Sequence, residues 1–226
     1  FAHAVNAKAV QNLAQIAEQK RLWLIHYSTD YVFDGRKQSP YLETDAPNPI
    51  NVYGASKLAG ERAIAEAGCQ HLIFRTTWVI GKDGNNFAKT ILRLAAERDS
   101  LKVINDQLGV PTSPYLISKV TIDAIQAIEQ GKAWPQGIYH LAPQGKSSWN
   151  EIAKTLIAYA EQQHMPLNAH AADIQAITTA DYPTVAKRPL NSQIDTHKLR
   201  SQLSFDLPHW KDDFLDVASE MIEELK

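Results

Sequence analysis

Short apolar runs rich in β-branched residues alternate along this chain with longer segments whose apolar residues recur at helical spacing. Strands are expected at residues 22–27, 71–79, 101–105 and 137–141. Helices are expected at residues 5–21, 52–67, 85–98, 116–130, 149–163 and 210–225. Each helix between two strands must bury its apolar stripe against a sheet, so this alternation is typical of parallel sheets covered by helices. The sequence therefore predicts an α/β fold with a doubly wound parallel sheet.

The strand signals fade after Pro143, where helices and proline-punctuated segments take over. Ser148 and Glu151 form a capping-box pattern that begins a helix, and prolines punctuate residues 182–189 before the last helix. We therefore predict a larger domain through residue 142 and a smaller C-terminal lobe over residues 143–226.

The composition excludes several classes of protein. With 226 residues, of which 44% are apolar, the chain can bury a sizeable core. Its formal charge of −2 comes from interspersed acids and bases, so no nucleic-acid partner is expected. No apolar run approaches the roughly 20 residues of a membrane span, and we expect neither a membrane partner nor a signal peptide.

The cysteine and histidine content bears on redox compartment and metal binding. Cys69 is the single cysteine, which fits a reducing compartment, so a cytoplasmic location is expected. The eight histidines show no metal-ligand spacing, and we predict no metal site from them.

A tyrosine and a lysine four residues apart, Tyr53 and Lys57, fall on one face of a predicted helix. The ammonium group of Lys57 can hold a hydroxyl group or lower the pKa of the phenol. Ser28 and Thr29 follow an apolar strand, at the edge where open α/β sheets bind ligands. This combination is typical of proton donation to a carbonyl oxygen.

The same spacing occurs a second time, at Tyr115 and Lys119. No hydroxyl motif ends a strand just before it, so we interpret this second pair as an ordinary helix start. Tyr53 instead follows Pro47–Pro49, which favours an extended approach to the helix. We therefore assign the chemistry to Tyr53 and Lys57.

Several motifs in a fixed order resemble the extended short-chain dehydrogenase/reductase family. They are Ser28–Gly35, Asn51–Gly54 with Lys57, and Phe74–Val79. The likeness to the nucleotide-sugar reductases of this family continues through residues 84–90, 103–112 and 187–189. It therefore covers essentially the whole chain.

This resemblance implies an activity and its catalytic residues. The expected reaction is reduction of C4 of dTDP-4-dehydro-6-deoxy-L-mannose by NADPH or NADH, giving dTDP-L-rhamnose for cell-surface polysaccharide. Tyr53 would protonate the alkoxide, and Lys57 would hold the nicotinamide ribose and lower the pKa of the phenol. Thr29 would hydrogen-bond the sugar oxygen or Tyr53. The expected cofactor contacts are Tyr27, Tyr53 and Lys57.

The resemblance also implies substrate contacts. These are Thr29, Asp30, Trp78, Asn86, Lys89 and Arg188. Trp78 would stack on the substrate, although a tryptophan at a strand end is also a common core residue. Asn86 and Lys89, with Asn85, would hold the diphosphate, although an Asn-Asn pair also suits a plain helix start. Ser28 and Thr29 could likewise be simple helix caps. Asn6 matches a structural or proton-relay asparagine.

No segment matches the glycine-rich turn that cradles a dinucleotide pyrophosphate. We therefore expect a Rossmann-like domain over residues 1–142 that is truncated at its N-terminus. Residues 143–226 would form most of the substrate lobe, with residues 81–101 contributing. The choice between NADH and NADPH is left open. A homodimer, with a magnesium ion at the dimer contact, is a further implication of the resemblance.

Two alternatives stay open. A related nucleotide-sugar epimerase or dehydratase shares the tyrosine–lysine pair, but the Thr29–Phe33 and Asn85–Phe87 segments favour the reductase. A non-catalytic, reductase-like regulatory subunit is the second alternative. The presence of Thr29, Tyr53 and Lys57 together favours catalysis.

Overall fold

The computed structural model describes residues 1–132, 134–182 and 186–225. Its contacts divide the chain into two compact units. The first unit comprises Phe1–Thr77, Val120–Ala142 and Val185–Asp206, and the second comprises Trp78–Lys119, Pro143–Thr184 and Leu207–Lys226. One passage of the chain from the first unit to the second lies between Ala142 and Pro143. Residues 78–119, however, cluster with the second unit, and residues 185–206 with the first.

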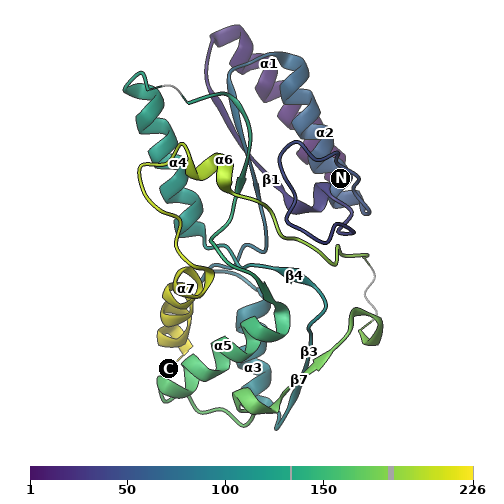
Figure 1. Ribbon diagram of the computed structural model, residues 1–226, viewed down its shortest axis with the longest axis vertical. Coiled ribbons are helices and arrows are strands. Elements are labelled where there is room, and N and C mark those ends of the chain that lie inside the picture. The colour runs from purple at the N-terminus through teal and green to yellow at the C-terminus, as the bar shows by residue number, and fades with distance from the viewer. Residues whose placement is uncertain (133, 183–185, 226) are drawn as a thin grey trace. The chain divides into compact units, whose positions relative to one another are not determined.

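The centre of the first unit is a three-stranded parallel sheet (Figure 1). It contains β1 (Leu24–Thr29), β2 (His71–Thr76) and β5 (Gly137–Leu141), in the order β1-β2-β5. Leu24 lies opposite His71, and Thr29 lies opposite Thr76. Because the strands are parallel, their carboxyl ends lie at one edge of the sheet, where ligands bind in open α/β folds.

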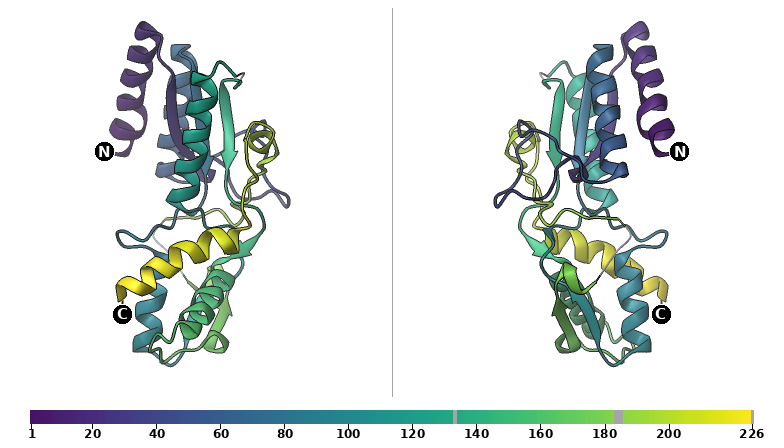
Figure 2. Two further views of the ribbon diagram at one scale, coloured as in Figure 1. Left: turned by 90° about the vertical axis from the view of Figure 1, so that its left-hand side faces the viewer. Right: turned by 90° about the vertical axis from the view of Figure 1, so that its right-hand side faces the viewer.

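Helices cover this sheet. The π-helical turn η1 (Ala4–Ala9) runs into α1 (Val10–Lys20), and α2 (Val52–Ala67) packs against both (Figure 2). The core between them consists of Val10, Ala14, Ala17, Ile64, Cys69 and Ile73. The first unit also contains the turn η2 (Asp30–Val32) and the short α6 (His197–Arg200).

The second unit contains two small sheets. In one, β3 (Leu101–Ile104) pairs in parallel with β7 (Ile174–Ile177); in the other, β4 (Leu108–Gly109) pairs antiparallel with β6 (Ser147–Ser148). The helical elements are α3 (Phe87–Glu97), α5 (Trp149–Gln162), η3 (Ala171–Asp173), η4 (Thr179–Asp181) and α7 (Trp210–Leu225). Helix α4 (Pro114–Glu129) begins in this unit and ends in the first.

The predicted α/β fold with a parallel sheet is confirmed. The expectation that residues 101–105 belong to the same sheet as the other strands is wrong, because β3 pairs with β7 instead. The side chains of β3 alternate between buried and less buried positions, as in a strand that covers a core with one face. Strand β7 was not predicted from the sequence.

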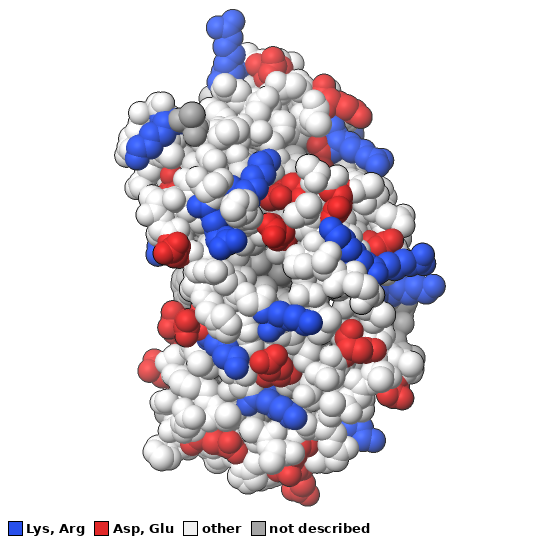
Figure 3. Space-filling view, viewed as in Figure 1, with Lys and Arg blue, Asp and Glu red and all other residues white. Residues whose placement is uncertain are grey.

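Lysine and arginine side chains are interspersed with aspartate and glutamate on the face shown in Figure 3. Within the part of the chain that the structure describes, no helix has both the length and the apolar character needed to cross a bilayer.

Candidate active site

The end of β1 brings three polar side chains into the first unit. Ser28, Thr29 and Asp30 are each at most 5% exposed. The Thr29 hydroxyl accepts a hydrogen bond from the Tyr31 backbone N–H at 3.1 Å and donates one to Asp30 Oδ1, also at 3.1 Å. Thr29 is therefore the N-cap of η2, so the capping interpretation is geometrically correct for this residue.

Asp30 is a buried carboxyl group. Burial raises its pKa to about 7, although the hydroxyl groups of Ser192 and Thr29 oppose this shift. Near neutral pH the side chain is therefore poised between its neutral and charged forms. In its neutral form it can donate a hydrogen bond, and in its charged form it can only accept one.

Tyr53 lies in the first turn of α2, on the side of the helix that faces η2. Its ring meets the Tyr31 ring edge-on, with the ring centroids 5.9 Å apart. Burial raises the pKa of Tyr53 above its usual value, a hydrogen bond with the Thr29 side chain opposes this, and the charge of Asp30 adds to it. Tyr53 and Thr29, which the sequence predicted to act together, are thus brought together by the fold.

Lys57 lies one helical turn after Tyr53, as predicted. Its ammonium group donates a hydrogen bond to the backbone carbonyl oxygen of Tyr27 at 2.5 Å. Burial is the main cause of the shift in the Tyr53 pKa and raises it, so a lowering of that pKa by Lys57 stays a prediction. Burial also lowers the pKa of Lys57 itself, while the charge of Glu61 raises it.

The first turn of α2 is fitted closely to η2. A Cβ atom on Gly54 would lie 2.0 Å from the Tyr31 carbonyl oxygen, so no side chain fits there. The Asn51 side chain caps the helix by accepting a hydrogen bond from the Gly54 N–H at 2.8 Å. It also donates one to the Lys187 carbonyl oxygen at 3.0 Å. These contacts fix the position of Tyr53.

Asn6 supports the same helix from the other side. Its amide donates a hydrogen bond to the Ser56 hydroxyl at 3.0 Å. Its backbone oxygen lies 2.2 Å from where a Cβ atom on Gly60 would be, so η1 and α2 are in close contact. This geometry fits the structural role expected for Asn6.

Two further predicted residues lie in the first unit. The Tyr27 hydroxyl shares a 2.7 Å hydrogen bond with the Thr121 hydroxyl, and its side chain is 40% exposed. Arg188 is exposed, and its charge lowers the pKa of Tyr31. Arg188 is therefore near the Tyr31–Tyr53 ring pair.

The remaining substrate candidates lie in the second unit. Trp78 has a left-handed backbone, with φ of +40°, and its ring stacks on that of Trp149 with centroids 4.0 Å apart. Asn86 caps α3 by accepting from the Lys89 N–H at 3.0 Å, and its amide donates to the Gly81 carbonyl oxygen at 2.7 Å. The helix-start interpretation of Asn86 is therefore geometrically correct.

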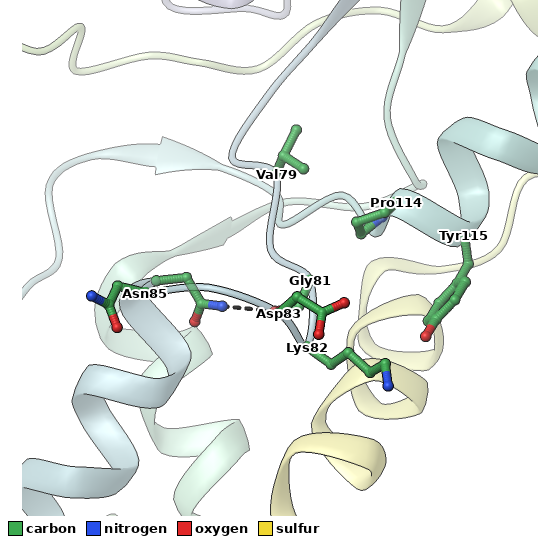
Figure 4. A pocket seen from close by; sticks show the side chains of 8 residues that line it. Val79, Gly81, Lys82, Asp83, Asn85, Pro114 and Tyr115 are labelled. Carbon is green, nitrogen blue, oxygen red and sulfur yellow. Dashed lines mark hydrogen bonds between the residues drawn. The ribbon is translucent and has the colours of Figure 1, made fainter. Parts of the chain in front are cut away.

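A pocket of about 310 Å³ opens beside this helix start (Figure 4). It is lined by Val79, Gly81, Lys82, Asp83, Asn85, Asn86, Pro114 and Tyr115. The Tyr115 hydroxyl donates a hydrogen bond to Glu220 at 2.7 Å. Tyr115 is the second residue of α4 and lies in the second unit.

The sequence matches the RmlD substrate binding domain family over residues 1–223. The chain belongs to this family. It is 46% identical to a dTDP-4-dehydrorhamnose reductase of Escherichia coli strain K12 over 211 residues, which cover 93% of this chain and 70% of that protein.

Solved structures agree with the family assignment. A dTDP-4-dehydrorhamnose reductase from Bacillus anthracis in complex with NADP is 33% identical, with a TM-score of 0.82, covering 96% of this chain and 73% of that one. A dTDP-4-dehydrorhamnose reductase from Clostridium acetobutylicum is 31% identical, with a TM-score of 0.84. The match covers 97% of this chain and 73% of that one.

The site residues of this RmlD-family chain fit a nicotinamide nucleotide. Lys57 supplies a cation at the end of β1, and the buried Ser28 hydroxyl has no hydrogen-bond partner among the residues that the structure describes. For metals, the described ranges contain no group of three or more His, Cys, Asp or Glu side chains that could hold an ion.

Sequence reasoning assigned no positioning role to several residues that hold the site in place. Gly54 carried a signal, because glycine is unfavourable inside a helix and needs a packing reason. Asn51 carried another, since asparagine is a preferred N-cap. Glu61 could have been noticed as a charge four residues beyond Lys57 on the same helix face. No pattern pointed to Trp149 as the partner of Trp78.

Proposed function

We propose that this protein reduces dTDP-4-dehydro-6-deoxy-L-mannose to dTDP-L-rhamnose with a nicotinamide cofactor. The observation that carries this proposal is the meeting of Tyr53 with Thr29 beside the strand end that Lys57 contacts, in a chain of the RmlD family. The proposal places the chain in the supply of rhamnose for cell-surface polysaccharides.

Tyr53 acts as the general acid. When bound, the reduced nicotinamide supplies hydride to C4 of the sugar, which leaves an alkoxide on the former carbonyl oxygen. Because burial keeps the Tyr53 pKa above its usual value, the phenol is protonated at neutral pH and holds the proton that the alkoxide takes. The Thr29 hydroxyl then stabilises the phenolate by turning its hydrogen from Asp30 Oδ1 to the phenolate oxygen.

Lys57 orients the cofactor, and solvent restores the proton of Tyr53. Its ammonium group is anchored on the Tyr27 carbonyl oxygen, which leaves further N–H donors for the hydroxyl groups of a ribose. Tyr53 is 48% exposed, so its proton can be replaced from solvent after each turnover.

The substrate residues bind the nucleotide sugar. Asp30 contacts the sugar, and Trp78 stacks on it. Lys89 and Arg188 neutralise the diphosphate, for which guanidinium and ammonium groups are suited. The Lys89 ammonium group lies 3.8 Å from Glu224, an exposed ion pair that a phosphate can replace. The Asn86 side-chain amide can donate to the diphosphate once its hydrogen bond to the Gly81 carbonyl oxygen is broken.

The cofactor preference, location and assembly are part of the proposal. NADPH and NADH are both candidates, and the relative of known structure with NADP supports a nicotinamide nucleotide in general. The buried free thiol of Cys69 supports a cytoplasmic location. A homodimer is testable by sedimentation of the purified protein.

The test is oxidation of NADPH and NADH by protein expressed from the complete reading frame, with dTDP-4-dehydro-6-deoxy-L-mannose as substrate. Tyr53→Phe should lower kcat by about 10²–10⁴-fold and leave nucleotide-sugar affinity unchanged. Tyr115→Phe, the same change in the second Tyr–Lys pair, should leave kcat unchanged. A folded wild-type protein with no turnover would favour the regulatory-subunit alternative, and activity in Tyr53→Phe would exclude Tyr53 as the donor.

A further inference from the structure

The backbone of Trp78 is in a conformation that tryptophan rarely adopts. Its φ of +40° lies in the left-handed region, where a side chain costs roughly 1–2 kcal/mol. Two hydrogen bonds hold this conformation: the Thr112 N–H donates to the Trp78 carbonyl oxygen at 3.2 Å, and the Ile80 N–H donates to the Thr112 carbonyl oxygen at 3.1 Å. Backbone strain of this kind is concentrated at functional sites.

The indole of Trp78 is stacked on a second indole. The ring centroids of Trp78 and Trp149 are 4.0 Å apart, and their planes differ by 19°. The Phe87 ring lies against Trp149, with centroids 4.6 Å apart. Both tryptophans are only partly buried, so the stack is reachable from solvent. Trp149 is the first residue of α5, whose N-cap is Ser148.

A directed chain of hydrogen bonds fixes the plane of Trp149. The indole N–H donates to Gln107 Oε1 at 3.1 Å, and Gln107 Nε2 donates to the Thr179 hydroxyl at 3.1 Å. That hydroxyl donates to Asp106 Oδ1 at 2.7 Å. An indole can only donate and a carboxylate can only accept, so every intermediate group has one possible direction. Gln107 is 3% exposed, so its side chain is shielded from water, whereas the bond between Thr179 and Asp106 is exposed.

We propose that Trp149, oriented by Gln107, is a positioning residue that holds the Trp78 indole in the plane needed to stack on the nucleotide sugar. This inference rests on the proposed function of Trp78. A Trp78 ring that is already fixed loses no rotational freedom when the nucleotide sugar binds. Fixing the ring in advance therefore raises the affinity for the nucleotide sugar. Gln107 and Trp149 act only through Trp78, and their removal affects binding of the nucleotide sugar rather than hydride transfer.

The first readout needs no activity. Two indoles this close couple as excitons, and a twist between their transition dipoles gives a pair of far-ultraviolet circular dichroism bands of opposite sign. Trp78→Phe and Trp149→Phe should each abolish the paired exciton bands. Gln107→Leu keeps both indoles and should only weaken these bands. Trp23→Phe, in the first unit and outside the stack, should leave them unchanged. Exciton bands that are unchanged in Gln107→Leu would overturn the orienting role of Gln107.

The second readout is affinity for dTDP-L-rhamnose, measured by calorimetry without turnover. Gln107→Leu and Trp149→Ala should each raise Kd by about tenfold, the size of one aromatic contact, with kcat and cofactor KM unchanged. Trp23→Phe should not change Kd. If Trp149→Ala is too unstable to measure, Gln107→Leu decides, since it retains both stacked rings.

The outcomes separate this inference from the proposed function. An unchanged Kd in Gln107→Leu, despite a weakened exciton signal, would overturn the positioning role even if the wild-type protein is active. Tight binding that depends on Gln107, in a protein that does not oxidise NADPH or NADH, would support the positioning role and contradict the proposed reaction.

Discussion

Arg75 and Glu61 form a two-pronged ion pair in the interior of the first unit. Arg75 Nε lies 2.9 Å from Glu61 Oε1, and Arg75 Nη2 lies 2.6 Å from Glu61 Oε2. Both side chains are at most 3% exposed. Glu61 lies on α2, one turn beyond Lys57, and Arg75 lies on β2. The pair therefore fastens the helix that carries Tyr53 to the central sheet.

Removing one partner should destabilise the fold strongly. Glu61→Ala leaves the Arg75 guanidinium buried without its counter-charge, which typically costs about 3–5 kcal/mol. Urea unfolding should show a loss of this size in the free energy of unfolding. Arg93 and Glu97 form an exposed pair on α3, so Glu97→Ala should cost about 1 kcal/mol or less. Equal losses in both variants would show that the buried pair does not anchor α2.

Local signals explain which parts of the fold were predictable. The bounds of α2 match the prediction, since Gly68 marks the end of the helix in the sequence, and Asn51, the N-cap that the structure shows, directly precedes the predicted start. The pairing of β3 with β7 joins segments about 70 residues apart, and neither strand has a local mark of its partner. Non-local pairing is fixed by tertiary contacts, which a single sequence does not encode locally.

The same distinction applies to the candidate site. The helical repeat predicted that Tyr53 and Lys57 share a face. The partner of Lys57 is a backbone carbonyl oxygen on Tyr27, and a backbone group has no signature in a sequence. The pKa of Tyr53 depends on burial, which is likewise a property of the assembled unit. Residue types were therefore predictable here, but their electrostatic environment was not.

Gly54 should tolerate no side chain. Gly54→Ala places a Cβ atom against the Tyr31 carbonyl oxygen and must push α2 away from η2, which moves Tyr53 relative to Thr29. We expect a fall in kcat of about a hundredfold, since small displacements of catalytic groups are costly. Steady-state kinetics of the purified variant measures this.

The matched control lies at the other end of α2. Gly68 has a φ of +74°, and a Cβ atom added to it would meet no neighbouring atom within 4 Å. Asparagine adopts this left-handed conformation readily. Gly68→Asn should therefore leave kcat near the wild-type value. If Gly54→Ala were as active as Gly68→Asn, the contact with Tyr31 would not position Tyr53.

Asp30 should make stability depend on pH in a defined window. Its pKa is about 7 in the folded protein and 3.8 as the reference value, so both states bind the proton only at a pH well below 3.8. As the pH rises towards 7, the unfolded state loses its proton first and unfolding is favoured. Asp30→Asn should therefore be more stable than wild type by up to about 4 kcal/mol above pH 7, and this difference should vanish at a pH well below 3.8.

Urea unfolding at a series of pH values measures this difference. Asp34 provides a control of opposite sign, because hydrogen bonding to the Arg36 N–H lowers its pKa. Asp34→Asn should be less stable than wild type at neutral pH, and the difference should shrink as the pH falls through the Asp34 pKa. A pH-independent gain in Asp30→Asn would show that Asp30 is not a buried titrating group.

At position 78, a glycine variant should be more stable than an alanine variant, which reverses the usual order of stability. Trp78→Gly and Trp78→Ala both remove the indole, but only alanine keeps a Cβ atom at a φ of +40°. Glycine is normally less stable than alanine by roughly 0.5–1 kcal/mol, whereas a left-handed backbone penalises any Cβ atom by roughly 1–2 kcal/mol. We therefore expect Trp78→Gly to be the more stable variant in urea unfolding.

Val79, the next residue, has no positive φ, so Val79→Ala should be more stable than Val79→Gly. The same order at both positions would mean that the backbone of Trp78 is unstrained, and its conformation would then give no support to a functional role.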